Sequence, residues 1–99
     1  MKFLVSEKIR TKLANKEPPV SQEEIEQCFA TRDSSFLEDT RANNSTIPPT
    51  LWFISDTFMG RKLKICFIQL QNGIAIKTAY EPSPAEVKVY RKYAAEVES

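Results

Sequence analysis

"GRKLKICFIQLQNGIAIKTAY", residues 60–80, is the stretch that decides the fold. Two apolar runs meet at Asn72-Gly73, a dipeptide that favours a type I′ turn because both central residues of that turn need a positive φ. The runs are rich in β-branched and aromatic residues, so they predict two antiparallel strands, over 61–71 and 74–80.

The predicted turn sets a register with Gln71 opposite Ile74, and the alternation of side chains then separates two faces. One face is apolar, and we expect helices to cover it. It holds Leu63, Ile65, Phe67, Ile74, Ile76, Thr78 and Tyr80. The other face is apolar near the turn and basic toward its far end, and we expect no helix over it. It holds Lys62, Lys64, Cys66, Ile68, Leu70, Ala75, Lys77 and Ala79.

The rest of the chain predicts helices before the hairpin and after it. Ser21 followed by Glu24 is a capping box, and Ser83, Pro84 and Glu86 repeat that start signal. The further predicted elements are helix 7–15, helix 21–30, strand 36–40, strand 51–57 and a C-terminal helix beginning at Pro84. The sequence therefore predicts one α+β domain over residues 1–99, a four-stranded antiparallel meander with two N-terminal helices and one C-terminal helix.

Two connections in this plan carry further expectations. A tight turn at Met59-Gly60 would place Trp52 and Ile54 in the core, although Met-Gly is a weaker turn signal than Asn-Gly. The polar stretch 41–49 predicts a long mobile loop.

The composition excludes several classes of function. The chain has 99 residues and no histidine, so the usual acid/base side chain for neutral pH is missing. Cys28 and Cys66 lie far apart without metal-ligand spacing, so we expect reduced thiols, no metal and no cofactor. No apolar stretch approaches the ~20 residues of a membrane span, and the start of the chain does not resemble a secretory signal. A cytoplasmic protein without membrane contact is expected.

The charge is unevenly distributed along the chain. Net charge is +1, but residues 60–93 carry seven basic and two acidic side chains. This excess is compatible with an anionic partner and equally with a solvated face. RNA can be cleaved without metal, because its own 2′-hydroxyl is the nucleophile and basic groups stabilise the developing charge. Lys62, Lys64 and Lys77, crowded on one face, are the candidate catalytic residues, since neighbouring cations lower the pKa of a lysine.

Each candidate also has a structural interpretation. In the predicted register Lys64 lies opposite Glu81 and would form an ordinary cross-strand ion pair. Tyr80 is a candidate for stacking on an RNA base, and Arg91 for contacting phosphate. Tyr90 belongs to the expected buried stripe of the last helix, and both Tyr90 and Tyr93 are interpreted as core residues more readily than as site residues.

Three segments carry a resemblance to a known family. "VSQEEIEQCFA" (20–30), "GRKLKICFIQ" (60–69) and "IAIKTAYEPSPAEVKVYRKY" (74–93) resemble segments of BrnT-type toxins, which belong to the RelE/ParE-like group of toxin–antitoxin modules. The resemblance implies a compact α+β domain, metal-independent ribonuclease activity with basic residues on the sheet, and a cognate antitoxin. It places Arg61 and Lys62 in the Gly-Arg strand start of the family.

Two functional hypotheses follow. In the first, the protein is toxin-like and binds RNA through Arg61, Tyr80 and Arg91; if it is an enzyme, it is a metal-independent endoribonuclease. In the second, it is a non-catalytic protein-interaction module or a homodimer that uses an open sheet face or edge. Uncovered apolar residues would favour the second hypothesis, and those expected on the open face are Leu51, Phe53, Ile68 and Leu70.

Overall fold

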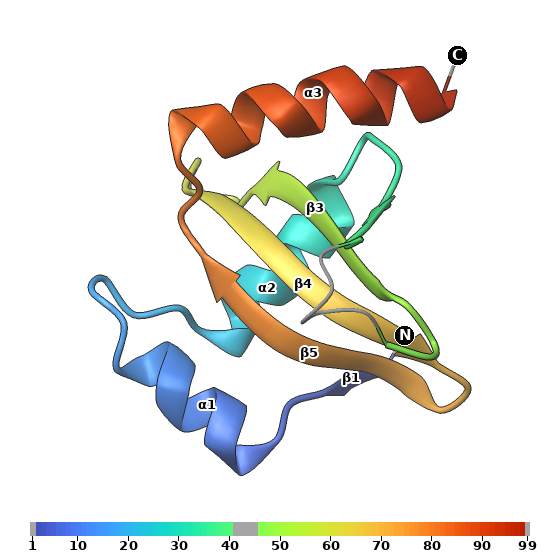
Figure 1. The fold of residues 1–99 in the computed structure, drawn as a ribbon. Helices are drawn as coiled ribbons and strands as arrows, with labels where there is room; N and C mark the ends of the chain where they lie inside the picture. Colours follow the sequence, from blue (N-terminus) through green and yellow to red (C-terminus); the bar gives the residue numbers. More distant parts are fainter. Residues whose placement is uncertain (1, 41–45, 99) are drawn as a thin grey trace.

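The computed structural model describes the backbone of residues 2–40 and 46–98 and the side chains of residues 2–40 and 46–94. Figure 1 shows how helices pack on a single sheet. In chain order the elements are β1 (Phe3–Leu4), α1 (Glu7–Ala14), α2 (Gln22–Thr31), β2 (Leu37–Glu38), β3 (Thr50–Asp56), β4 (Lys62–Leu70), β5 (Gly73–Tyr80) and α3 (Pro84–Glu98). The prediction of an α+β protein is confirmed.

The sheet is mixed and has five strands in the order β1-β5-β4-β3-β2. Strands β2 to β5 pair antiparallel, as predicted, but β1 joins the edge of β5 in parallel, with Phe3 beside Ile74. The predicted four-stranded meander is therefore incomplete, because a strand of two residues is too short to show alternation. Gly73 permits this pairing, since a Cβ there would lie 2.6 Å from the carbonyl oxygen of Lys2.

The capping signals in the sequence mark the start of α2 correctly. The Ser21 hydroxyl accepts a 3.1 Å hydrogen bond from the backbone N–H of Glu24, and the Glu24 carboxylate accepts one of 3.0 Å from the backbone N–H of Ser21. The capping box is thus complete, and Val20 just before it is buried.

The side of the sheet that faces α2 carries the main hydrophobic core. Phe29 of α2 lies with its ring centroid 4.7 Å from that of Phe53 and 5.2 Å from that of Phe67. In Figure 1, α2 is seen behind the strands on this far side. Other buried members of the core are Ile25, Cys28, Leu63, Ile65, Ile74, Ile76 and Ala79.

The turn between β4 and β5 differs from the prediction. Leu70 pairs with Gly73 and Phe67 with Ile76, so the predicted register is wrong by two residues. A shift of two keeps every side chain on its face. The apolar residues predicted for the core of this hairpin are accordingly buried: Leu63, Ile65, Phe67, Ile74 and Ile76.

A bulge in β5 exchanges the faces beyond Ile76. Two consecutive residues of β4 pair with Ile76 and Thr78, so Lys77 between them is an extra residue. From there Ala79 is fully buried, whereas Thr78 and Tyr80 lie on the opposite face of the sheet. The prediction that Thr78 and Tyr80 belong to the core is wrong, because alternation alone does not reveal a bulge.

The connection between β3 and β4 is a loop of residues 57–61 and not a two-residue turn. Asp56 pairs with Lys62, one residue away from the register of a tight turn. A shift of one exchanges the two faces. Trp52 and Ile54 therefore lie on the same face as Lys64, so the predicted face, that of Leu63 and Ile65, is wrong. Ile54 is nevertheless buried in the core, and Trp52 packs against it.

The same shift places Leu51 and Phe53 on the α2 side, opposite Phe67 and Ile65, so they do not lie on an open face as predicted. Of the predicted mobile loop 41–49, positions 41–45 lie outside the described residues. None of the helices in the described part of the chain has the length and apolar character needed to cross a membrane.

Candidate functional site

The face of the sheet that carries Lys64 is covered by α3. Tyr90 of α3 packs on Trp52 with ring centroids 5.5 Å apart, and its hydroxyl donates a 3.0 Å hydrogen bond to the carbonyl oxygen of Ser35. In Figure 1, α3 runs above the upper ends of β3 and β4, whereas α2 lies behind the strands. The prediction that no helix covers this face is wrong, because the apolar stripe of α3, with Tyr90 and Ala94 buried, packs there.

Lys64 is enclosed beneath the first turn of α3. Its residue exposure is 6%, and its ammonium lies 3.0 Å from Oε2 of Glu86. The same ammonium lies 4.4 Å from the centroid of the Trp52 ring and 5.7 Å from that of the Tyr80 ring. Lys64 thus has a carboxylate and two aromatic rings as neighbours, which together compensate a buried cation.

Glu86 makes contacts through both of its carboxylate oxygens. Oε1 accepts a 3.0 Å hydrogen bond from the backbone N–H of Ser83, and the Ser83 hydroxyl accepts one of 3.2 Å from the backbone N–H of Glu86. The capping contacts predicted for α3 are therefore present. Oε2 accepts hydrogen bonds from Lys64 (3.0 Å) and from the Tyr80 hydroxyl (2.7 Å). One carboxylate ties the start of α3 to β4 and β5.

These contacts fix the protonation states of the cluster. Burial lowers the pKa of Lys64, but the hydrogen bonds with Glu86 and Tyr80 outweigh burial, and the pKa of Lys64 lies above its usual value. Burial raises the pKa of Glu86, but the hydrogen bonds from Ser83, Tyr80 and Lys64 bring it down to about 2. Lys64 therefore stays an ammonium at neutral pH, the opposite of the lowered pKa that the catalytic hypothesis requires.

The three predicted catalytic lysines occupy three different environments. Lys62 forms a 2.9 Å ion pair with Asp56, in which the two side chains are 40% and 50% exposed. Lys77 is the bulged residue of β5, and Lys64 is enclosed under α3. The expectation of one open basic face is therefore wrong, because a bulge and a helix divide it. The predicted ion pair of Lys64 with Glu81 is also wrong, because Lys64 pairs with α3.

Arg61, predicted to bind RNA, joins separate parts of the fold. Its guanidinium donates to both carboxylate oxygens of Glu24 (3.0 and 3.1 Å) and to Glu81 (3.1 Å). It also donates to the carbonyl oxygens of Pro18 (3.0 Å) and Pro19 (2.7 Å). Its side chain is only 18% exposed. These contacts give Arg61 a structural role in holding the segment before α2 against the sheet.

Two of the predicted residues share a groove. Lys62 and Arg91 both line a hollow of about 380 Å³ between the end of α2, the end of β3 and the middle of α3. Its lining is mainly polar and includes carboxylates as well as hydroxyl groups. The other lining residues are Thr31, Asp33, Ser34, Ile54, Ser55, Asp56, Val87 and Tyr90.

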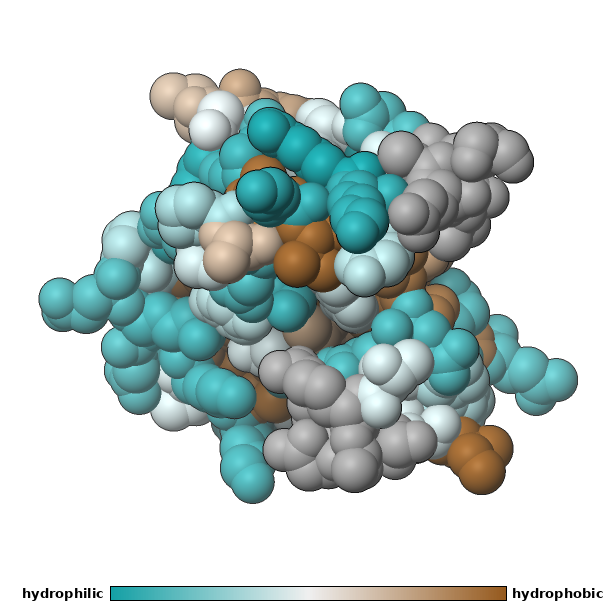
Figure 2. All heavy atoms as spheres, turned by 45° about the horizontal axis from the view of Figure 1, so that its top comes forward, coloured by the Kyte–Doolittle hydropathy of each residue, from teal (hydrophilic) through white to brown (hydrophobic). Residues whose placement is uncertain are grey.

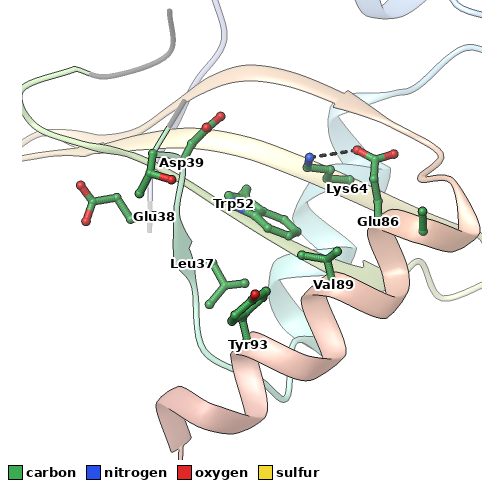
Figure 3. Close-up of a pocket in the computed structure, with 10 residues that line it drawn as sticks. Leu37, Glu38, Asp39, Trp52, Lys64, Glu86, Val89 and Tyr93 are labelled. Atoms are coloured by element: carbon green, nitrogen blue, oxygen red, sulfur yellow. Dashed lines mark hydrogen bonds and ion pairs between the residues drawn. The ribbon is translucent and has the colours of Figure 1, made fainter. Parts of the chain in front are cut away.

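A larger cavity, of about 810 Å³, opens between α3 and the β2–β3 side of the sheet; we call it the α3 cavity. Figure 3 shows the ion pair of Lys64 and Glu86 at one end, Trp52 in the middle, and Glu38 and Asp39 at the other end. In Figure 2, which brings this side forward, hydrophobic surface appears between hydrophilic side chains. The lining is completed by Leu37, Thr40, Ala85, Val89 and Tyr93.

The alternation of residues did not reveal this cavity, because its walls come from segments far apart in the chain. Tyr93 was expected to pack in the core, yet it is 46% exposed at the edge of the cavity, beside Val89 at 44%. One signal was present: a lysine inside the apolar run 63–67 of a central strand predicts an acid as its partner. The half-buried Glu86 is that acid.

No family model matches the chain, and no curated protein or solved structure matches it either. Across the described side chains of residues 2–40 and 46–94, no group of three or more cysteine, aspartate or glutamate residues is placed to hold a metal ion. The function is therefore inferred from the two hollows and the side chains that line them.

Proposed function

We propose that this protein is a non-catalytic interaction module whose α3 cavity receives a segment of a partner protein. The carrying observation is the cavity itself, about 810 Å³ in volume, with the large apolar side chains Val89 and Tyr93 44% and 46% exposed at its edge. Apolar surface gathered around a hollow is typical of binding sites, whereas isolated apolar residues on a surface are ordinary.

The partner favoured by the resemblance to BrnT-like toxins is a cognate antitoxin protein. After β1, which was not expected, the elements follow in the expected order of two helices, antiparallel strands and a helix, and this order supports the proposal. A cytoplasmic setting is part of the proposal, since Cys28 and Cys66 are both buried and neither forms a disulfide.

The test is comparative capture of partners. Tagged wild-type protein and a Val89→Asp variant are expressed in the source cells, and the proteins that each retains are compared by mass spectrometry. We expect one stoichiometric partner that is lost from the variant, because a carboxylate at the edge of the cavity removes apolar contact and adds a charge to desolvate. Lys88→Asp is the control, because Lys88 is exposed on the same helix and does not line the cavity.

Two outcomes would refute the proposal. The first is a partner retained equally by wild type and by Val89→Asp. The second is that gel filtration shows a homodimer that Val89→Asp leaves intact and no other protein is retained. Circular dichroism of all variants verifies that α3 remains folded.

A second candidate function is RNA binding, followed by metal-independent cleavage if the protein is an enzyme. It is favoured by Lys62 and Arg91, which line one polar groove, and by the basic excess of residues 60–93. Single-stranded RNA is the probe, and we expect binding that weakens with salt and that decreases in a Lys62→Ala/Arg91→Ala double variant. Lys8→Ala, on α1, is the control. RNA binding equal in all proteins, or none at all, would remove this candidate.

The catalytic part of the second candidate is tested separately. Lys77→Ala leaves the ion pair of Lys64 and Glu86 intact, so loss of RNA cleavage in this variant would identify Lys77 as a functional group. Cleavage at the wild-type rate would exclude Lys77 from the chemistry.

A further inference from the structure

We propose that the partner segment binds in an extended conformation, as a further strand on the outer edge of β2, with apolar side chains in the α3 cavity. This inference rests on the proposed protein-binding function and adds the conformation and the side-chain pattern of the partner. Its basis is the position of β2, which is both the last strand of the sheet and one wall of the cavity.

The backbone of Glu38 points away from the sheet. The N–H of Asp39 donates a 2.8 Å hydrogen bond to the carbonyl oxygen of Thr50, so Asp39 directs its backbone groups toward β3. Along an antiparallel pair, residues of this kind alternate with residues whose N–H and C=O face outward. Glu38, the neighbour of Asp39, is therefore an outward-facing residue, and in the described part of the chain no strand pairs with this side of β2.

The α3 cavity reaches this outer edge. Side chains of a strand alternate between its two faces, so a hollow over one face meets every second residue. The α3 cavity is instead lined by the consecutive residues 37–40, although Figure 3 shows Leu37 directed toward α3 and Glu38 directed away from it. A segment that enters the cavity therefore also runs along the backbone of β2.

An extended segment satisfies this edge, whereas a helix does not. Any segment seated on the cavity removes water from the N–H and C=O of Glu38, and a polar group left without a partner opposes binding. The backbone groups of a helix are bonded within the helix, but a strand offers its N–H and C=O groups sideways. Because β2 has only two residues, few such bonds form, and the apolar contact has to supply most of the affinity.

The apolar part of the cavity sets the side-chain pattern of the partner. Figure 3 shows Trp52 on the sheet facing Val89 and Tyr93 of α3, with Leu37 of β2 beside them. An aromatic wall with half-exposed apolar neighbours is the type of pocket that receives an anchor residue at protein interfaces. Since side chains alternate along a strand, every second residue of the partner segment should be apolar and face this wall.

The opposite edge of the sheet is less suited to strand addition. There β1 already covers β5 at Ile74 and Ala75, and beyond them β5 carries the bulge at Lys77. Bulges and lysines at a sheet edge discourage pairing with another chain. The pairing of β2 with β3 shows no such shift, so β2 is the edge that accepts a strand.

The experiment uses Trp52 as a reporter, because it is the only tryptophan of the chain and lines the cavity. The full-length protein is titrated with a short peptide in which leucine and threonine alternate, with terminal lysines for solubility. Two twins carry backbone N-methyl groups, one on every leucine and the other on every threonine, so each twin blocks one edge of the extended peptide. We expect the parent peptide to change Trp52 fluorescence saturably. One twin should bind roughly tenfold more weakly and the other like the parent.

Glu38→Pro tests the edge from the side of the protein, because proline removes the outward N–H and leaves the hydrogen bonds between β2 and β3. We expect it to weaken the parent peptide by about three- to tenfold. Glu38→Gln, which keeps the N–H, should lose less. The control is Glu7→Pro, at the first position of α1, where proline is tolerated, and it should bind like wild type. Circular dichroism verifies the fold of each variant, and the N-methyl twins test pairing independently of them.

The inference is overturned if the parent peptide leaves Trp52 fluorescence unchanged, or if both twins bind alike. It is also overturned if a peptide of the same composition, rearranged into an amphipathic helix, binds more tightly than the parent. A homodimer that Glu38→Pro dissociates would assign the edge to a second copy of the chain and contradict the inference as well.

These failures are distinguishable from failure of the proposed function. If Val89→Asp still abolishes capture of the cellular partner, the cavity binds that partner in another conformation. If Val89→Asp retains the partner, the proposed function itself is wrong.

Discussion

Lys64, in the middle of β4, and Glu86, in the first turn of α3, form an ion pair with 3.0 Å between Nζ and Oε2. The side chains are 8% and 30% exposed, so the pair is largely removed from water at the cation. This contact joins a strand to a helix that lies 22 residues further along the chain. It ties the first turn of α3 to the face of the sheet that carries Lys64.

Removal of one member of this pair should destabilise the fold more than removal of both. Glu86→Leu leaves the ammonium of Lys64 buried without its carboxylate, and we expect a loss of about 3 kcal/mol in the free energy of unfolding. Adding Lys64→Met should restore most of that loss, because an apolar side chain of similar length then fills the site. Urea denaturation measures the free energy of unfolding of the single and the double variant. A double variant as unstable as Glu86→Leu alone would contradict this account.

Stability should fall in acid through Glu86. Its pKa is lowered from 4.5 to about 2 in the folded protein, so the deprotonated form stabilises the native state. That contribution is complete above the unfolded-state value and is lost as the pH falls from about 4.5 through about 2. The urea midpoint, measured from pH 5 to pH 2, should decrease less in Glu86→Gln than in wild type. Glu7→Gln, the control, should follow wild type, and an unchanged slope in Glu86→Gln would refute the assignment.

Gly73→Ala should weaken the parallel edge of the sheet. Gly73 has a φ of +151°, and an added Cβ would lie 2.6 Å from the carbonyl oxygen of Lys2, which also accepts the 2.8 Å hydrogen bond from the N–H of Ile74. We expect a loss of about 1–3 kcal/mol in unfolding free energy and faster amide exchange at Ile74. Gly60→Ala, in open space, separates the conformational penalty from the clash. Unchanged protection of Ile74 would mean that β1 moves aside freely.

Arg61→Lys should not be a conservative change. A lysine has one ammonium and cannot reproduce the guanidinium that reaches Glu24, Glu81 and two carbonyl oxygens at once. We expect a loss of about 2 kcal/mol, because hydrogen bonds to charged groups are lost and Glu24 keeps a partly buried charge. Lys62→Ala, which removes an exposed ion pair, should cost less than about 1 kcal/mol. Thermal unfolding measures the loss of stability in both variants. Equal losses in Arg61→Lys and Lys62→Ala would exclude a structural role for Arg61.

The local signals of the sequence predicted the helices and strands more accurately than the register in which the strands pair. Ser21 with Glu24 and Ser83 with Glu86 determine their helix starts through contacts within three residues, and both predictions are confirmed. The alternation in β4 also placed Lys64 on the correct face, opposite to Leu63 and Ile65. What these signals do not contain is the pairing between strands.

The errors in predicting the site have three sources: a bulge, a loop that shifts a strand register by one residue, and the packing of α3, which depends on residues far apart in the sequence. The bulge at Lys77 and the loop 57–61 each change a register by one residue, which exchanges faces without changing the local pattern. The position of α3 depends on the match of its apolar stripe, with Tyr90, to Trp52 across 38 residues of sequence. For these reasons the lysines could be found in the sequence, but the cavity could not.

The contact of Glu86 with Lys64 also has a consequence for natural variation. The acid at position 86 serves the helix start and the buried ammonium together, so a change at one site alters the selection on the other. Among homologous chains we expect covariation: where an apolar residue stands at position 64, the acid at 86 is free to be replaced by another helix-capping side chain. Where the lysine is kept, Asp or Glu should accompany it.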